Sequence, residues 1–224
     1  IEQQELLKKW KMMGSSQKQI MPEKEMCLEK SKGSLLVFIY ILLFFKLAFS
    51  NQNSEGFSEY VINYFSSINN FSAKFIQSDG KTIEEGKLYI GEERLRIEYE
   101  NPNKILIILD KNKAMFHNYS LDETEFFNPK DTPALFFFKI FKNQDYFYNM
   151  EINLNDNNVV MTKTENIDDV NYNIKIYFEN NPLILRKIIV ENDFDYLEVS
   201  LSDHNLNENY DKNFFKLINP KLLN

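Results

Sequence analysis

The chain has 224 residues, which is enough for one large domain or two small ones. Its 43% hydrophobic and 26% charged residues are close to globular averages, which argues against wholesale disorder and against a polytopic membrane protein. One cysteine and two histidines exclude a disulfide framework and make a metal site hard to assemble, and the lack of glycine after Gly91 argues against a glycine-rich phosphate loop there.

Charge and asparagine content divide the chain near residue 50. Residues 1–50 carry a net charge of +3 and no asparagine, whereas residues 51–224 carry a net charge of −10 and 28 asparagines. A body this acidic repels phosphate backbones and anionic lipid headgroups. Nucleic acid is therefore not expected as a partner.

An apolar run in residues 35–45 is typical of the core of a signal peptide. It is too short to span a bilayer, for which about 20 residues are needed. Lys30 and Lys32 provide the positive flank, and residues 48–50 (Ala-Phe-Ser) offer a cleavage site before Asn51. The alternative is an uncleaved membrane anchor.

We therefore expect three parts. Residues 1–25 are interpreted as a non-native or over-extended segment, residues 26–50 as a cleavable signal peptide, and residues 51–224 as a single exported domain. Cys27 precedes the apolar run, so it is not placed to be the lipid anchor of a lipoprotein.

The first element of the body is an amphipathic helix over residues 54–68. Its apolar residues follow a spacing of three and four, which is helical. They are Phe57, Tyr60, Val61, Tyr64, Phe65 and Ile68. Packing against a sheet is the expected role, and a role facing a ligand is the alternative.

A meander of antiparallel strands follows, because the apolar period falls to two and turn residues recur every ten to twelve positions. Strands are expected at 71–77, 82–90, 94–100, 104–110, 113–119, 123–128, 146–154, 159–165, 171–179, 183–191 and 195–202. Asp79-Gly80 predicts a type I′ hairpin turn after the first of them. The strand at 104–110 is apolar at both parities, so both of its faces must be covered.

The segment 129–142 interrupts the meander. Thr132 can cap a short helix with Pro133 at its first position, and the helix then continues as an apolar run through Phe141. A helix that is apolar almost all round must be buried or must cover an apolar hollow. A curled sheet would offer such a hollow on its concave side.

An enzyme would have to rely on His117 or His204, and neither lies near a recognisable nucleophile in the sequence. No catalytic residue, metal site or cofactor is expected.

Several short motifs, taken in order, resemble the outer-membrane lipoprotein carrier protein family, LolA. They are residues 71–77 with a Phe-x-Gln ending, residues 86–90 (Gly-x-Leu), residues 94–99 (Arg-x-Arg-x-Glu-Tyr) with Pro102, the Thr132-Pro133 helix start, residues 182–185, and Asn209, Phe214, Phe215 and Pro220 near the end. The resemblance covers residues 57–220.

The resemblance implies an α+β fold that is mainly β: an incomplete antiparallel β-barrel of about 11 strands, lidded by short helices. It implies a periplasmic chaperone of a Gram-negative bacterium, rather than an enzyme, that carries acylated lipoproteins from an inner-membrane ABC transporter to an outer-membrane receptor. It implies a monomer that uses no nucleotide or other cofactor.

The expected acyl-chain cavity combines one face of several strands with two helix residues: Phe71, Phe75, Leu88, Leu95, Ile97, Tyr99, Leu106, Ile108, Leu135 and Phe138. The expected lid residues are Thr132, Pro133, Phe136, Phe137 and Phe141. Many family members carry a basic residue before the Arg-x-Arg strand, which in some ties the lid shut. Gly91-Glu92 occupies that place here.

The main alternative is another periplasmic lipid-binding protein or an acyl-sensing regulator with the same half-barrel. An outer-membrane receptor would need a cysteine after the signal core, and the sequence has none there.

Overall fold

The computed structural model describes residues 52–68, 70–132, 134–155, 157–167, 169–206 and 208–222. The segments expected before the domain, residues 1–25 and 26–50, lie outside the described residues, as does Pro133.

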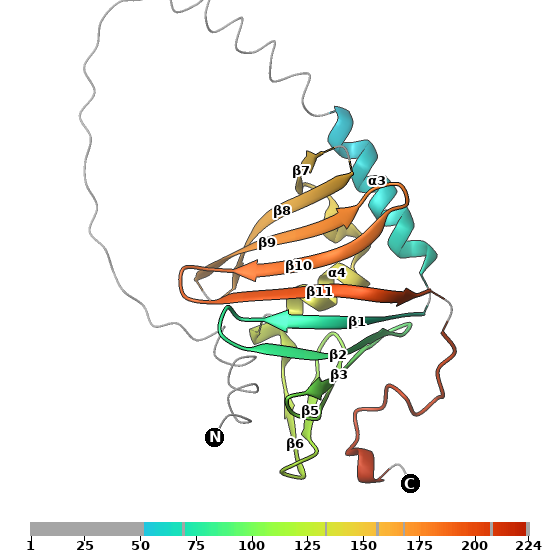
Figure 1. The fold of residues 1–224 in the computed structure, drawn as a ribbon, viewed down its shortest axis with the longest axis vertical. Helices are drawn as coiled ribbons and strands as arrows, with labels where there is room; N and C mark the ends of the chain where they lie inside the picture. Colours follow the sequence, from blue (N-terminus) through green and yellow to red (C-terminus); the bar gives the residue numbers. More distant parts are fainter. Residues whose placement is uncertain are drawn as a thin grey trace, which may run out of the picture.

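The described residues form one antiparallel sheet of eleven strands in the order β6-β5-β4-β3-β2-β1-β11-β10-β9-β8-β7 (Figure 1). The strands are β1 (Phe71–Ser78), β2 (Ile83–Ile90), β3 (Leu95–Asn101), β4 (Ile105–Leu109), β5 (Ala114–Asn118), β6 (Glu123–Phe127), β7 (Glu151–Leu154), β8 (Asn158–Ile167), β9 (Val170–Glu179), β10 (Ile184–Glu191) and β11 (Tyr196–Asn205). Two meanders are joined through β1 and β11, where Phe75 pairs with Leu201. Since β6 and β7 do not pair with each other, the sheet is an incomplete barrel, as predicted.

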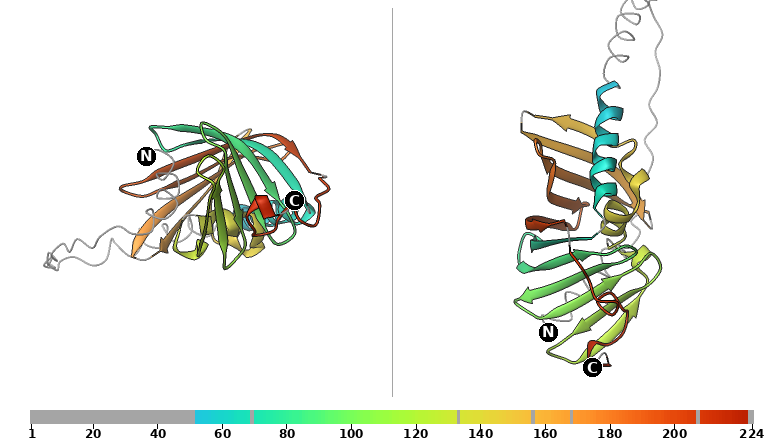
Figure 2. Two further views of the ribbon diagram at one scale, coloured as in Figure 1. Left: turned by 90° about the horizontal axis from the view of Figure 1, so that it is seen from below. Right: turned by 90° about the vertical axis from the view of Figure 1, so that its right-hand side faces the viewer.

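Two α-helices pack on the concave side of this curved sheet (Figure 2). The first is α3 (Gln52–Ser67), at the place where helical spacing predicted it, and the second is α4 (Ala134–Lys142). Short 3₁₀ turns flank α4: η1 (Pro129–Asp131) and η2 (Gln144–Phe147). A third, η3 (Pro220–Leu222), lies near the chain end.

The type I′ turn predicted after β1 was wrong. Ser78 pairs with Ile83, so the first hairpin loop has four residues, and Asp79 accepts hydrogen bonds from the amides of Lys81 and Thr82. A two-residue type I′ turn needs positive φ at both central positions, and of the loop residues Gly80 alone has it (φ 84°).

The strand expected at 146–154 begins only at Glu151, because residues 144–147 form η2 and residues 148–149 continue it as a turn. There the Asn143 side chain accepts from the amide of Asp145 and closes the turn. The turn buries Phe147, whose ring stacks on Phe65 of α3 at 5.0 Å between centroids. Packing against α3 thus outweighs the alternating pattern of these residues.

The chain end covers part of the convex face. Leu217 packs on a small cluster of β4 and β5 side chains, Leu106, Ile108 and Met115. Arg96 of β3 donates to the carbonyl of Phe214 at 2.6 Å, and its guanidinium lies 4.3 Å from the centre of that ring. The apolar outer face of β4 is therefore buried by residues more than 100 positions later in the chain.

Gly86 allows β2 and β3 to approach closely beneath an aromatic pair. A Cβ at this position would lie 2.0 Å from the carbonyl oxygen of Glu98 and 2.8 Å from the ring of Phe75. The Phe75 ring meets that of Tyr99 edge-to-face at 5.1 Å.

We expect Gly86→Ala to lower the free energy of unfolding by about 2–3 kcal/mol or more, because backbone must move to admit the methyl group. Gly56→Ala is the matched control: a Cβ there meets nothing within 4 Å, and alanine in a helix should stabilise by roughly 0.5–1 kcal/mol. Urea unfolding followed by circular dichroism measures both. Equal stability of Gly86→Ala and the parent would contradict this account of β2.

Candidate functional site

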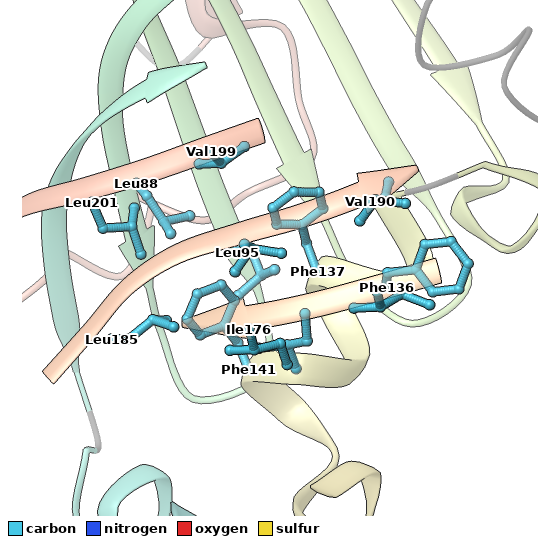
Figure 3. Close-up of a cluster of buried hydrophobic side chains, with 14 of the residues drawn as sticks. Leu88, Leu95, Phe136, Phe137, Phe141, Ile176, Leu185, Val190, Val199 and Leu201 are labelled. Atoms are coloured by element: carbon cyan, nitrogen blue, oxygen red, sulfur yellow. The ribbon is translucent and has the colours of Figure 1, made fainter. Parts of the chain in front are cut away.

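The concave face of the sheet is an apolar surface covered by α4. Six residues expected to line a cavity, Phe71, Phe75, Leu88, Leu95, Ile97 and Tyr99, are all buried in the main hydrophobic cluster on this face. Figure 3 shows Leu88 and Leu95 gathered there with Phe137 of α4 and Val199 and Leu201 of β11.

Phe137 reaches into the centre of this face. It lines a small cavity together with Phe75, Leu88, Ile97 and Tyr99 from one half of the sheet, and Ile188, Val199 and Leu201 from the other. The free space is about 20 Å³, little more than one water molecule needs. In this structure the helix therefore occupies the hollow almost completely.

One polar side chain in the cavity was not predicted as a site residue. Gln77 is 3% exposed, its Oε1 accepts from the Tyr99 hydroxyl at 2.8 Å, and its Nε2 donates to Glu84 at 2.7 Å. The sequence contained the signal, because Gln77 continues the alternating row of Phe71, Ala73 and Phe75. This satisfied polar group is well placed to orient a ligand in an otherwise apolar hollow.

The contribution of β10 and β11 was also missed. Ile188, Val199 and Leu201 line the cavity as fully as the β2 and β3 residues do. Val199 and Leu201 alternate with polar neighbours in the sequence, whereas Ile188 lies in an apolar run of three residues. That these strands join the sheet through β1 was not visible in the sequence.

The expected positions of two β4 residues are corrected. Leu106 and Ile108 lie on the convex face, in the cluster that Leu217 covers, whereas Ile105, Ile107 and Leu109 face the main core. Ile107 pairs with Ile97 of β3, and paired residues point to the same face of the sheet, so Ile107 points inward as Ile97 does. Because β4 is apolar at both parities, its own sequence contains no signal for which face turns inward.

The helix residues are also redistributed. Phe136, Phe137 and Phe141, expected in the lid, are the deeply buried ones, and Leu135 and Phe138, expected in the cavity, are half-buried against the margin of the main cluster. The side of α4 that carries the three expected lid phenylalanines therefore faces into the hollow.

Thr132 does not cap α4 with its side chain as predicted. Its hydroxyl donates to the carbonyl of Pro129 at 3.0 Å, which closes the preceding 3₁₀ turn. Its backbone carbonyl accepts from the amide of Leu135 at 3.0 Å and so begins the helix.

Two lysines of α4 tie the helix to opposite halves of the sheet. The Lys139 ammonium pairs with the carboxylate of Glu165 on β8, and Lys142 Nζ donates to the carbonyl of Gly91 in the turn between β2 and β3. Neither contact was predicted: Lys139 lay within the expected apolar run, and Lys142 was only the last residue of the segment 129–142. Their spacing of three places them on neighbouring positions of one helix face.

Burial lowers the pKa of Lys142 to about 8, against an ordinary value of 10.5, while the nearby Glu92 carboxylate opposes this shift. The ammonium form of Lys142 is therefore less favourable in the folded protein than in water.

This shift predicts a pH dependence of stability. Between pH about 8 and 10.5 the unfolded chain holds the Lys142 proton and the folded chain releases it, so this group's contribution to stability rises with pH across that window. We expect the parent to gain stability relative to Lys142→Met between about pH 7.5 and about pH 10, measured by urea unfolding. Parallel pH profiles of the two proteins would exclude the shift.

The histidines have structural contacts. His117 is fully buried with Nδ1 2.9 Å from the hydroxyl of Thr124, and His204 Nε2 lies 2.7 Å from the carbonyl of Leu185. Burial lowers the pKa of both imidazoles. Within the described part of the chain, no three acidic, histidine or cysteine side chains are grouped as metal ligands.

Among the helices of the described segments, none has the length and apolar character required to cross a bilayer.

The sequence model of the family described as outer membrane lipoprotein carrier protein LolA matches residues 66–218. A search of curated protein sequences found no match.

Similar solved structures include an uncharacterized conserved protein from Thermus thermophilus, with a TM-score of 0.45 and 6% identity over 72% of this chain and 96% of that one. LprF from Mycobacterium bovis gives a TM-score of 0.38 and 9% identity over 70% and 95% of the two chains. MucB, crystallised with MucA(peri), gives 0.41 and 9% over 72% and 58%. We draw no functional conclusion from similarity at this level.

Proposed function

The chain belongs to the outer membrane lipoprotein carrier protein family, LolA, and on this premise we propose that it carries acylated lipoproteins across the periplasm. The observation that supports this role most directly is the apolar concave face with Phe137 inserted into it. An acyl chain is apolar, as is the Phe137 side chain that it would replace.

The energetics of acyl chains explain why such a carrier closes when empty. A sixteen-carbon chain exposed to water costs on the order of 12 kcal/mol, at about 0.8 kcal/mol per methylene. A carrier that gained all of this free energy on binding the chain could not release its cargo. Since α4 already fills the hollow, loading exchanges one set of apolar contacts for another, and the net gain stays small enough for delivery.

The two lysine tethers fit a helix that moves. Each joins α4 to the sheet by one polar contact, which water can replace when the helix leaves. In the contact implied by the family resemblance, the basic side chain belongs to the turn before the Arg-x-Arg strand. Here the basic side chain belongs to the helix, and the turn supplies the carbonyl of Gly91 as acceptor. Gly91-Glu92 is thus compatible with a closed lid.

The proposed carrier role also covers the processing of the chain and its partners. Residues 26–50 act as a cleaved export signal, and residues 51–224 form the mature single-domain carrier, a monomer. It accepts lipoproteins from an inner-membrane ABC transporter and delivers them to an outer-membrane receptor. It is not an enzyme and binds no cofactor; α4 movement, rather than a titrating group, drives transfer.

We predict that fixing α4 to the sheet abolishes transfer. In a Cys27→Ser background, Lys139→Cys and Glu165→Cys replace an existing contact between α4 and β8 and can be joined by a short, reducible bis-maleimide. The cross-linked protein should release at least tenfold less lipoprotein from spheroplasts, and cleaving the linker should restore release.

A matched control is Lys74→Cys with Asp203→Cys, which replaces an ion pair of 2.6 Å between β1 and β11 and does not involve α4. Its cross-linked form should retain activity. Normal release by the α4 cross-link would contradict the lid mechanism. If the uncross-linked parent binds acyl chains but releases no lipoprotein, the acyl-sensing regulator becomes the better interpretation.

A further inference from the structure

A second, larger opening lies where the end of α3, the end of α4 and the β2–β3 turn meet. Its volume is about 460 Å³, and Glu92 and Lys142 lie on its wall with Phe65, Ile68 and Phe141. We call this opening the vestibule. Figure 2 (right) shows the end of α3 beside α4 at this place.

The apolar wall of the vestibule is shared with the protein interior. Phe65, Ile68 and Phe141 also line a hollow of about 10 Å³ beneath it, together with Phe71 and Leu185. The rings of Phe65 and Phe141 meet edge-to-face at 5.9 Å, and Phe141 stacks on Phe71 at 6.4 Å. Parting Phe65 from Phe141 would therefore connect the vestibule to the concave core.

Lys142 brings a hydrogen-bond donor to this opening. Its Nζ donates to the backbone carbonyl of Gly91, and the groups that face it include the Glu92 carboxylate. A ligand carbonyl is an acceptor of the same kind as the carbonyl of Gly91. Exchange between the two acceptors leaves the buried donor satisfied and so costs little.

We propose that the vestibule binds the head of an acyl chain, with Lys142 donating to its carbonyl oxygen while the chain passes between Phe65 and Phe141. This inference rests on the proposed function and identifies where the cargo's polar end lies. The same breaking of the Lys142–Gly91 contact releases α4 at its C-terminal end, so recognition of the head and opening of the helix are coupled.

Ester and amide carbonyls at the acylated cysteine of a lipoprotein and the carboxylate of a free fatty acid share this chemistry. The test therefore compares three fluorescence-displacement probes: a dipalmitoyl-S-glyceryl-cysteinyl peptide, the same peptide with ether-linked hexadecyl chains, and palmitate. The ether analogue keeps the chains and lacks the ester carbonyls.

Either peptide breaks the Lys142–Gly91 contact when α4 opens, but only the ester peptide offers Lys142 a replacement acceptor. We therefore expect the parent to bind the ester peptide about tenfold more tightly than the ether peptide, a difference of about 1.4 kcal/mol. Lys142→Met should remove this preference while retaining affinity for the ether peptide. Lys139→Met is the matched control, because Lys139 contacts Glu165 outside the vestibule and should leave the preference intact. Lys142→Arg should retain much of it.

Persistence of the ester preference in Lys142→Met, or its loss in Lys139→Met to the same extent, would overturn the assignment. Thermal unfolding of each variant separates these results from loss of fold. Failure of the parent to bind either peptide would instead count against the proposed function. Lys142-dependent binding of palmitate tighter than that of the ester peptide would support the vestibule and assign it to fatty acids, against a lipoprotein cargo.

Discussion

The insertion of one apolar helix into the concave face of an open sheet is the interaction on which the rest of this structure depends. An eleven-stranded sheet that does not close has an apolar inner surface that must be covered. The phenylalanines of α4 cover it, and Phe137 fills the centre. The covering element is a nine-residue helix rather than a second sheet, and under the proposed function an acyl chain replaces it without unfolding the barrel.

Polar contacts set how firmly this helix is held. Apolar burial is strong and non-directional, so by itself it would favour a permanently closed carrier. The contacts of Lys139 with Glu165 and of Lys142 with Gly91 fix the position of α4 at two points, and under the proposed function water or ligand replaces them when the helix moves. Gln77 and Tyr99 add a satisfied polar pair inside the cavity. Under the proposed lid mechanism, apolar groups stabilise the closed form and polar contacts control its opening.

Much of the architecture was predictable because alternation and turn chemistry are local properties. The β1, β2 and β3 rows alternate cleanly, so Phe75, Leu88 and Ile97 were assigned to the correct face. Helical spacing identified α3, and the all-round apolar character of α4 indicated that it must be buried. The start of β7 was misplaced, since the packing of Phe147 on Phe65 joins residues 82 positions apart.

The sequence by itself determined the antiparallel meander, the covering helix and the inward rows of β1, β2 and β3, because each depends on periodicity within one segment. The incomplete barrel was implied by the family resemblance. Only the tertiary structure decided the inward face of β4, which is apolar at both parities and takes its phase from β3. It alone brought β10 and β11 to the cavity and Lys142 to the carbonyl of Gly91. A backbone carbonyl is present at every residue, so no sequence pattern marks the one that a distant lysine will meet.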